Sequence, residues 1–567
     1  MAVYKSPAEL EKYRQTLLAE RKKNPPCVTV CSGTGCHAVE SQDVSRAFAE
    51  ELKRNGLEGK VRLRVTGCQG FCEKGPIVSI QPADVCYLSV KAADVPEIVQ
   101  STVIGKKIIE RLLYKSDDGK LIQHEADIPF YKNQTRTVFG NNRFIDPASL
   151  DDYLAVGGYS ALAKALFKMT PEQVLAEVKK ANLRGRGGAG FPAGQKWETT
   201  RNAPGDIKYV IVNAEEGDPG AFKDGNLLEG NPHCILEGLA IGAYAMGSHQ
   251  GYVFVRQEYP LAVASITAAI EKARECGFLG KNILGSGFDF EVKVQKGAGA
   301  FVSGESSALM TAIEGRVSEP RTKYIRTSVS GVWQRPSNLN NVETWANVPL
   351  IINNGADWFA GIGTAGSKGT KIFSLTGKVK YTGLVEVPMG TTIRKIIFDF
   401  GGGIADGKKF KAVQTGGPLG GFIPESLLDM PVDYDEMTKA GSMMGSGGMI
   451  VMDENTCMPD MARYFLNFLA EESCGKCVPC REGIHQLLKI MNRICKGEGR
   501  PGDLESLEEI ARVCQDFALC QLGKSAANPV MSSIKYFHAE YEAHINDKKC
   551  PAGVCKALTT STRRGEK

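Results

Sequence analysis

Two groups of cysteines in this sequence have the spacing of iron-sulfur ligands. The first group consists of two pairs in glycine-containing turns: Cys31 and Cys36 in CSGTGC, and Cys68 and Cys72 in GCQGFC. Four thiolates of this kind can supply two ligands to each iron of a 2Fe-2S cluster, and the glycines let the backbone approach the inorganic sulfides. One alternative is a four-cysteine zinc knuckle, but its pairs rarely enclose a whole helix and strand. The other is a thioredoxin-type redox pair, but no CxxC occurs here. The pattern therefore favours a 2Fe-2S cluster.

The second group joins three closely spaced cysteines to a distant one. Cys474, Cys477 and Cys480 form CxxCxxC in ESCGKCVPCREG, and Cys520 follows forty residues after Cys480. Three near thiolates can cover three corners of a cubane while a remote thiolate takes the fourth. Because a zinc site more naturally uses two equal pairs, this group predicts a 4Fe-4S cluster.

A third set near the C-terminus mixes nitrogen and sulfur ligands. His544, Cys550 and Cys555 lie in EAHINDKKCPAGVC, and Cys457 in DENTCMPD could close a tetrahedron if the fold brings it near. These ligand types and spacings favour zinc. Free surface thiols and an ordinary histidine are the alternative.

A glycine-rich stretch, LRGRGGAGFPAGQKW at 183–197, contains Gly185, Gly187 and Gly190 in the order GxGxxG. In a dinucleotide-binding fold that pattern must follow a strand. Here it follows a predicted helix that begins at Thr170 with a capping box. The glycines, with two nearby cations, instead suit a loop that cradles phosphate and a flavin ring, although a tight turn with solvated charges would have the same composition.

Three polar stretches follow the glycine-rich one. They are NAEEGDPGAFKDG at 213–225, GAFVSGESSAL at 299–309 and NLNNVET at 338–344. Acids, asparagines and glycines on loops after strand-like runs can bind ribityl hydroxyls and ribose diols. Each stretch taken alone would be a solvated loop.

The order of these four stretches, between about residues 146 and 525, resembles the NADH-binding flavoprotein subunit of respiratory complex I. The CxxCxxC motif with its following Arg481, Glu482 and Gly483 occurs in the same subunit. The first cysteine group resembles the thioredoxin-like ferredoxin domain of its small partner subunit, and the C-terminal stretch resembles the β subunits of multimeric NAD-linked FeFe-hydrogenases.

The resemblance implies which residues bind the cofactor and the substrate. FMN would be held by Gly185, Arg186, Gly187, Lys196, Asn213, Glu215, Glu216, Gly304, Glu305, Asn340 and Asn341. The dinucleotide would face Phe191, Lys196, Asp218 and Glu305. The sequence departs from the family at Ser306, where a second acid is common, and at Asp218, where glutamate is usual. The latter bears on recognition of the adenosine ribose, so the expected substrate is NAD(H), with NADP(H) as the alternative.

The chain must build several domains to position these groups, because 567 residues exceed one hydrophobic core. Val44, Phe48 and Leu52 recur at helical spacing before the strand-like run VRLRV, which indicates a small α/β domain. Runs such as YVIVN and GYVFV between helical stretches indicate a second α/β layer structure. We expect a multidomain α/β protein. Its first half would hold a thioredoxin-like 2Fe-2S domain at 1–100, a linker at 101–145 and an FMN- and NADH-binding α/β domain at 146–360. A small β-grasp-like domain at 361–440, a helical 4Fe-4S domain at 450–545 and a C-terminal tail at 546–567 would follow.

Composition limits the functional classes. A net charge of +5, 43% hydrophobic and 23% charged residues are ordinary for a globular protein, so nothing calls for nucleic acid or an anionic membrane. No signal-peptide core and no run of eighteen apolar residues occur, so a cytoplasmic protein is expected.

A flavin connects two-electron hydride donors to one-electron clusters, so no side-chain acid-base catalyst is expected. The sequence therefore predicts the electron-transfer subunit of an NAD-linked FeFe-hydrogenase, or of an electron-bifurcating relative, in a hetero-oligomer with a hydrogenase catalytic subunit and a small 2Fe-2S subunit. The diaphorase subunit of an NAD-dependent formate dehydrogenase, or of a complex I-like NADH dehydrogenase, is the alternative within this class. A non-catalytic iron-sulfur docking scaffold is the alternative from another class.

Overall fold

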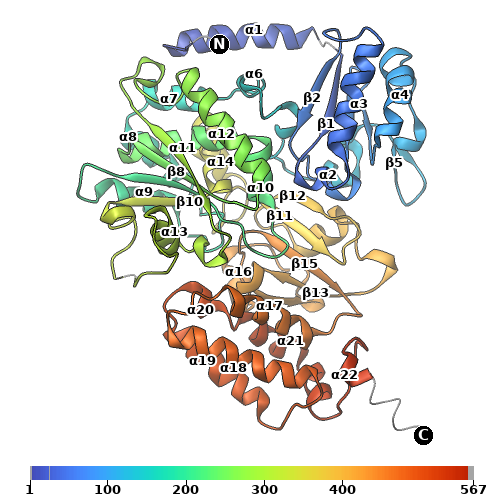
Figure 1. Ribbon diagram of the computed structural model, residues 1–567, viewed down its shortest axis with the longest axis vertical. Helices are drawn as coiled ribbons and strands as arrows, with labels where there is room; N and C mark the ends of the chain where they lie inside the picture. The colour runs from blue at the N-terminus through green and yellow to red at the C-terminus, as the bar shows by residue number, and fades with distance from the viewer. Residues whose placement is uncertain (1–2, 24–25, 323, 560–567) are drawn as a thin grey trace.

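The computed structural model describes residues 3–23, 26–322 and 324–559, and the remaining positions, including the last part of the expected tail, lie outside it. Figure 1 shows a small sheet at the upper right, a larger α/β body at the upper left, a second mixed sheet in the middle and a group of helices at the bottom. No helix of the described ranges has the length and apolar character needed to cross a bilayer.

The first body is a four-stranded sheet in the order β2-β1-β3-β4. Its strands are β1 (Cys27–Cys31), β2 (Arg62–Thr66), β3 (Val78–Gln81) and β4 (Val85–Tyr87). Helix α3 (Ser41–Arg54) buries Val44, Phe48 and Leu52 against this sheet, as their spacing predicts. The helix α1 (Pro7–Lys22) lies away from this sheet, along the second body (Figure 1), where Tyr4 donates its N–H to Cys276 O at 3.0 Å.

The second body contains a parallel sheet in the order β10-β7-β8-β9. Its strands are β7 (Tyr209–Ala214), β8 (Gln250–Arg256), β9 (Glu291–Gly297) and β10 (Ser337–Asn341). Helices such as α11 (Pro232–Met246) and α14 (Val342–Asn354) cover the sheet. The central strands are therefore buried, which agrees with their apolar sequences. The glycine-rich stretch lies between α8 (Pro171–Lys180) and α9 (Ala193–Asn202), so it follows a helix. The predicted capping box is present, with Gln173 N donating to Thr170 Oγ1 at 3.3 Å.

The third body is a mixed five-stranded sheet in the order β12-β11-β15-β13-β14. Its strands are β11 (Thr370–Gly377), β12 (Gly383–Pro388), β13 (Phe410–Thr415), β14 (Gly421–Pro424) and β15 (Gly448–Asp453). The central strand β15 comes after residue 440, where the sequence analysis ends this region. The stretch expected as a linker at 101–145 packs on the same sheet: the buried Glu386 carboxylate accepts from Val138 N at 3.0 Å and from Phe139 N at 2.9 Å.

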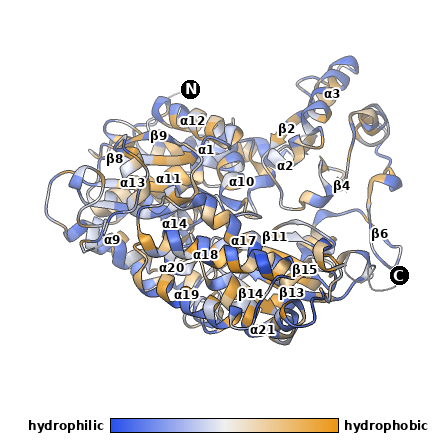
Figure 2. Cartoon of the chain, turned by 60° about the horizontal axis from the view of Figure 1, so that its bottom comes forward, coloured by the Kyte–Doolittle hydropathy of each residue, from blue (hydrophilic) through white to orange (hydrophobic). Residues whose placement is uncertain are grey.

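The C-terminal body is helical. It consists of α17 (Met458–Glu472), α18 (Val478–Cys495), α19 (Asp503–Phe517), α20 (Gln521–Ser525) and α21 (Asn528–Ile545), followed by the short α22 (Lys556–Thr559). In Figure 2 these helices carry both hydrophilic and hydrophobic stretches, as expected for amphipathic helices with one buried side. Helix α21 lies against β14, where Phe422 N donates to Ser532 Oγ at 3.0 Å.

Candidate functional site

The first cysteine group converges at one end of the N-terminal sheet. Cys31 ends β1 and Cys36 lies in the short helix α2 (Thr34–His37), while Cys68 and Cys72 follow β2. The Sγ atoms of Cys31 and Cys36 are 3.3 Å apart, and those of Cys68 and Cys72 are 3.6 Å apart. This arrangement in two close pairs fits a 2Fe-2S cluster with two thiolates on each iron.

The turns around this group are docked on the second body. Thr34, between Cys31 and Cys36, donates its N–H to Glu229 Oε2 at 2.9 Å and its hydroxyl to Glu229 Oε1 at 2.5 Å. A Cβ on Gly67 would come 2.2 Å from Gly230 Cα, so only glycine permits this approach. The cysteine turns therefore contact α10 (Lys223–Gly230), which belongs to the second body.

The second cysteine group lines one pocket. Its lining includes Cys474, Cys477, Cys480 and Cys520, together with Val302, Pro320 and Lys476. Leu519 N donates to Cys477 Sγ at 3.4 Å, and burial raises the pKa of the Cys480 thiol to about 12. A bound metal would hold these sulfurs as thiolates. The donor set, four cysteines that line one pocket, fits a 4Fe-4S cluster.

The expected flavin-binding loops meet at the carboxyl edge of the parallel sheet. Asn213 and Asn341 are register partners at the ends of β7 and β10. A Cβ on Gly187 would lie 3.1 Å from Asn341 Cβ, which places the glycine-rich loop beside that asparagine. Asn213 Nδ2 donates to Gly304 O at 2.9 Å. Four stretches that are distant in the sequence therefore form one site, at the edge where parallel α/β sheets bind ligands.

Two carboxylates at this edge have unsatisfied oxygens. Both carboxylate oxygens of Glu215 and Oε1 of Glu216 are buried without a hydrogen-bond partner among the described residues. Burial raises the pKa of each carboxyl to about 8, and the Arg256 guanidinium, 3.4 Å from Glu215 Oε1, acts in the opposite direction on Glu215. Buried polar atoms normally have partners, so these oxygens fit a polar ligand that donates hydroxyl or N–H groups. The residues present therefore fit FMN.

Several predicted binding residues make contacts that the sequence analysis did not anticipate. The buried guanidinium of Arg186 donates to the carbonyl oxygens of Thr370 at 3.1 Å, Arg184 at 2.9 Å and Lys368 at 2.5 Å. This side chain therefore ties the glycine-rich loop to the third body. The Asn340 amide lies 2.8 Å from Asn338 Oδ1 and 3.0 Å from Trp197 Nε1, within the packed interior.

The remaining predicted residues lie around the edge of the site. Glu305 caps α13 (Ser306–Ile313), accepting from Ser307 N at 2.9 Å and Ala308 N at 3.0 Å. Lys196 Nζ donates to Leu339 O in β10. The Phe191 ring is 42% exposed, with the Arg326 guanidinium 5.6 Å from its centre, and Asp218 lies against the Gly417 turn of the third body.

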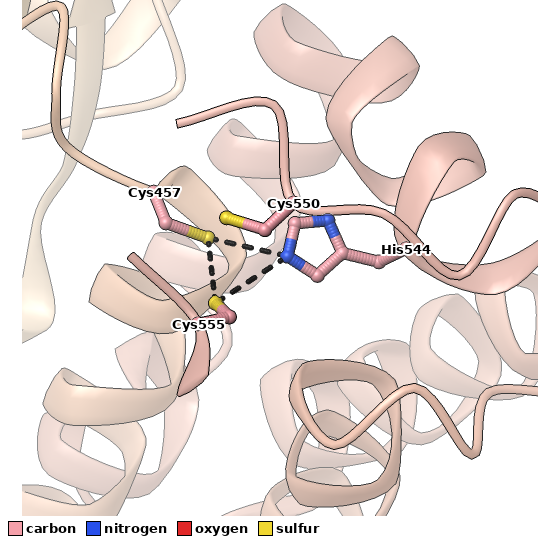
Figure 3. A group of neighbouring side chains, drawn as sticks. All are labelled: Cys457, His544, Cys550 and Cys555. Atoms are coloured by element: carbon pink, nitrogen blue, oxygen red, sulfur yellow. Dashed lines mark hydrogen bonds between the residues drawn. The ribbon is translucent and has the colours of Figure 1, made fainter. Parts of the chain in front are cut away.

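The Cys/His set at the C-terminus is assembled, as Figure 3 shows. One ligand atom from each of Cys457, His544, Cys550 and Cys555 lies within 4.8 Å of all the others, and all four residues are buried. His544 Nε2 is 3.4 Å from Cys457 Sγ and 3.5 Å from Cys555 Sγ. Four ligands about 2.0–2.3 Å from one zinc ion would have similar spacings.

The environment of this set orients its ligands. His544 Nδ1 is 2.6 Å from Glu540 O, so Nδ1–H can donate there and Nε2 is left to face the sulfurs. The Cys457 thiol and then the His544 ring lower the pKa of Cys555 to about 5. The donor set is therefore the one that zinc prefers in a closed, four-coordinate structural site.

Sequence reasoning missed a buried charge network next to the flavin site. Lys223, Asp224, Glu343 and Lys371 have side chains that are at most 2% exposed. The signal in the sequence is a lysine inside an apolar strand, TKIFSL, and an acid two residues after an asparagine pair, NNVE. Buried charges of this kind are rare unless they are paired.

Comparison with known proteins identifies three matching family models. They are the Nuo51 FMN-binding domain at residues 178–350, the NADH-ubiquinone oxidoreductase-F iron-sulfur binding region at 460–544 and the thioredoxin-like [2Fe-2S] ferredoxin at 13–102. Each covers one of the cofactor sites described above.

Curated relatives cover most of the chain. The NADP-reducing hydrogenase subunit HndC of Solidesulfovibrio fructosivorans is 53% identical over 431 residues, which are 76% of this chain and 88% of that protein. An NADH-quinone oxidoreductase subunit of Rhizobium meliloti is 46% identical over 402 residues, 71% of this chain and 96% of the relative. The NAD+-reducing [NiFe]-hydrogenase in the H2-reduced state has a chain with the same fold, with a TM-score of 0.66 at 24% identity over 98% of this chain and 95% of that one.

Proposed function

The chain belongs to the family of the FMN-binding flavoprotein subunit of NADH-quinone oxidoreductases, and from this membership we propose that it is the NAD(H)-linked electron-transfer subunit of a hydrogenase. It is an NADH dehydrogenase subunit that binds FMN, one 2Fe-2S cluster and one 4Fe-4S cluster. The hydrogenase assignment is supported by the 53% identity to a hydrogenase subunit. The proposal covers both a simple NAD(H)-linked hydrogenase and an electron-bifurcating one.

The observation that carries the proposal is that one short segment, residues 302–304, contributes to both the flavin site and the 4Fe-4S pocket. Val302 lines the cysteine pocket, and Gly304, two residues later, accepts from Asn213 at the flavin site. Bound FMN would supply the conversion between two-electron hydride transfer and single-electron transfer. The chain's residues would hold the flavin through Asn213, Glu215 and Asn341, and the 4Fe-4S ligands lie on the other side of the 302–304 segment.

The first experiment tests the cofactor and the half-reaction. The purified chain should contain about one FMN and six irons, which corresponds to one cluster of each type, and NADH should bleach its flavin absorbance. It should also reduce a viologen dye without any partner. A preparation with full iron content but no flavin would identify an iron-sulfur docking protein instead.

The identity of the complex is tested with the native assembly. Affinity purification from the source organism should recover a hydrogenase catalytic subunit and a small 2Fe-2S subunit, and the complex should evolve or consume hydrogen with NAD(H). Recovery of formate dehydrogenase activity in place of hydrogenase activity would overturn the assignment while leaving the NADH half-reaction intact.

We also propose that Cys457, His544, Cys550 and Cys555 bind one zinc ion that fixes the C-terminal segment to α17 and α21. Four protein ligands leave no open coordination position, so this ion would be structural. In the described part of the tail, the buried Leu558 and the partly buried Ala552 pack around the ligands.

A further inference from the structure

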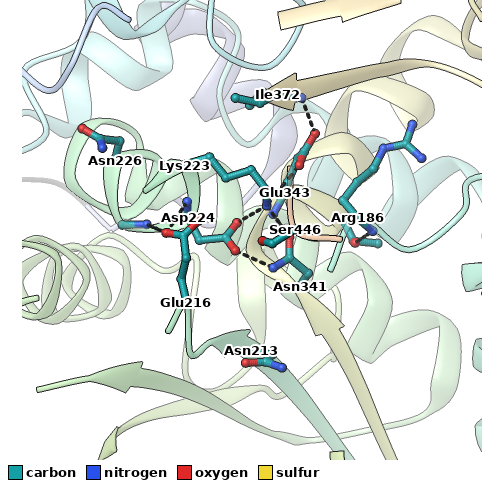
Figure 4. A network of polar contacts seen from close by, with 12 residues as sticks. Arg186, Asn213, Glu216, Lys223, Asp224, Asn226, Asn341, Glu343, Ile372 and Ser446 are labelled. Atoms are coloured by element: carbon teal, nitrogen blue, oxygen red, sulfur yellow. Dashed lines mark hydrogen bonds and ion pairs between the residues drawn. The ribbon is translucent and has the colours of Figure 1, made fainter. Parts of the chain in front are cut away.

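The flavin site lies next to a buried network of four charged side chains (Figure 4). Lys223 Nζ is 2.6 Å from Asp224 Oδ1 and 3.1 Å from Glu343 Oε2. Lys371 Nζ is 2.6 Å from the same Glu343 oxygen. Two lysines and two carboxylates are therefore buried together, and Glu343 is the carboxylate that both lysines contact.

The network directly holds two of the residues expected to bind FMN. Lys223 Nζ donates to Asn341 Oδ1 at 3.0 Å, and Asn341 Nδ2 donates to Asp224 Oδ2 at 2.6 Å. Asp224 N and Gly225 N donate to Glu216 Oε2 at 2.9 and 3.1 Å. A change in this network therefore acts on the flavin site through Asn341 and Glu216.

The same network joins the second body to the third. Glu343 lies in α14, whereas Lys371 lies in β11. Ile372 N donates to Glu343 Oε1 at 2.9 Å, and Lys371 Nζ donates to Ser446 O at 2.8 Å. The bodies that enclose the flavin loops are thus held together by charges and not only by apolar packing.

Charges in this position act over a distance because little water screens them. The interaction of two unit charges grows as the effective dielectric falls, and it is much larger inside a protein than at its surface. Hydride transfer from NADH adds one negative charge to the flavin and leaves NAD+. A lysine near the flavin stabilises that added charge, and a carboxylate near it opposes the charge.

We propose that Lys223 and Glu343 are positioning residues that hold Asn341 in place, Lys223 directly and Glu343 through Lys223, and that they set the reduction potential of the bound flavin with opposite signs. This inference rests on the proposed function. The network contains two lysines and two carboxylates, and removal of one member exposes the charge of its partner.

The test compares two neutralising variants with their combination. Lys223→Met should lower the flavin midpoint potential, Glu343→Gln should raise it, and the double variant should return it toward the wild-type value. Potentials are measured by redox titration of the flavin absorbance, and FMN content by acid release of the flavin. A purely structural role would move both single variants in the same direction or leave both potentials unchanged, and either result overturns the proposal.

Loss of flavin in the single variants is also informative. If Lys223→Met and Glu343→Gln each bind no FMN, the double variant should recover it because charge balance is restored; a double variant that also lacks FMN contradicts the proposal. Arg493→Met is the matched control, since Arg493 pairs with the buried Asp503 (Nε to Oδ2, 2.9 Å) in the helical body. It should leave the flavin potential unchanged.

The outcome separates the inference from the proposed function. A wild-type protein that binds no FMN, or whose FMN is not reduced by NADH, contradicts the proposed function whatever the variants do. A wild-type protein that passes both tests while the variants show no shifts contradicts only the inference.

Discussion

Two cysteine-rich sites in the C-terminal body differ in how they are enclosed. The Cys457/His544/Cys550/Cys555 set is buried, and its four ligand atoms lie within 4.8 Å of one another. In the CxxCxxC site with Cys520, Cys474 and Cys477 are partly exposed, and the cysteines line a pocket that also includes Val302 from the second body. The first geometry suits one ion with no open position, and the second suits a larger cluster next to another cofactor. The comparison predicts a structural role for the closed site and an electron-transfer role for the open one.

The largest expected effect comes from the open site. Cys477→Ser should abolish the 4Fe-4S electron paramagnetic resonance signal and most one-electron acceptor activity, because a cubane corner loses its thiolate. NADH should still bleach the flavin, since hydride transfer precedes the cluster. Stopped-flow absorbance measures the bleaching. Unchanged acceptor turnover without the signal would show that electrons leave the flavin by another route.

A smaller effect is expected at the closed site. Cys550→Ser should remove about one zinc per chain and lower the melting temperature by several degrees, because metal binding contributes directly to folding stability. Iron content and NADH-driven dye reduction should be retained. Elemental analysis and thermal unfolding check both points. A wild-type preparation with full iron and no zinc would leave these residues as ordinary thiols and a histidine.

A substitution in the N-terminal cysteine group tests whether that group and the CxxCxxC group bind two separate clusters. Cys68→Ser should remove a 2Fe-2S signal and leave the 4Fe-4S signal, since the Cys68 and Cys72 sulfurs form their own close pair. Dye reduction by NADH should fall less than in Cys477→Ser, because the flavin and the 4Fe-4S pocket are untouched. If both variants lost the same signal, the division of these eight cysteines into two clusters would be wrong.

The smallest effects are expected from adding a methyl group at one glycine near each site, because the free space at the two glycines differs. A Cβ on Gly523 would lie 2.9 Å from Cys480 Cβ, whereas a Cβ on Gly553 would meet nothing within 4 Å. Gly523→Ala should therefore reduce 4Fe-4S occupancy. Gly553→Ala should keep the zinc and cost about 1 kcal/mol of unfolding free energy, because Gly553 has a φ of +70°.

Chemical denaturation and iron and zinc analysis of both glycine variants test this contrast. Full 4Fe-4S content in Gly523→Ala would show that the pocket yields to the added methyl group, and zinc loss in Gly553→Ala would show that the closed site depends on its loop.

The cofactor inventory was predictable from the sequence because thiolate ligands are identified by residue type and spacing. The two iron-sulfur groups and the Cys/His set each supply the donor chemistry of one centre, and the structure brings Cys457 close to His544 although the two are far apart in the sequence. The helix at Thr170 was equally predictable, because a capping box depends on residues within one turn. That local signal was enough to separate the glycine-rich loop from a dinucleotide-binding fingerprint.

The direction of individual side chains was decided only by the tertiary structure. Arg186 lies in the predicted loop, but its guanidinium turns to the carbonyl oxygens of Thr370 and Lys368, which the sequence places far away. Glu305 forms a helix cap, and Lys371 finds its carboxylate partner in another body. A buried charge takes whichever partner the packing brings within reach, because an unpaired one costs several kcal/mol. The sequence by itself therefore determined which chemistry the chain carries, and the packing of distant segments decided which side chains serve the flavin site and which hold it together.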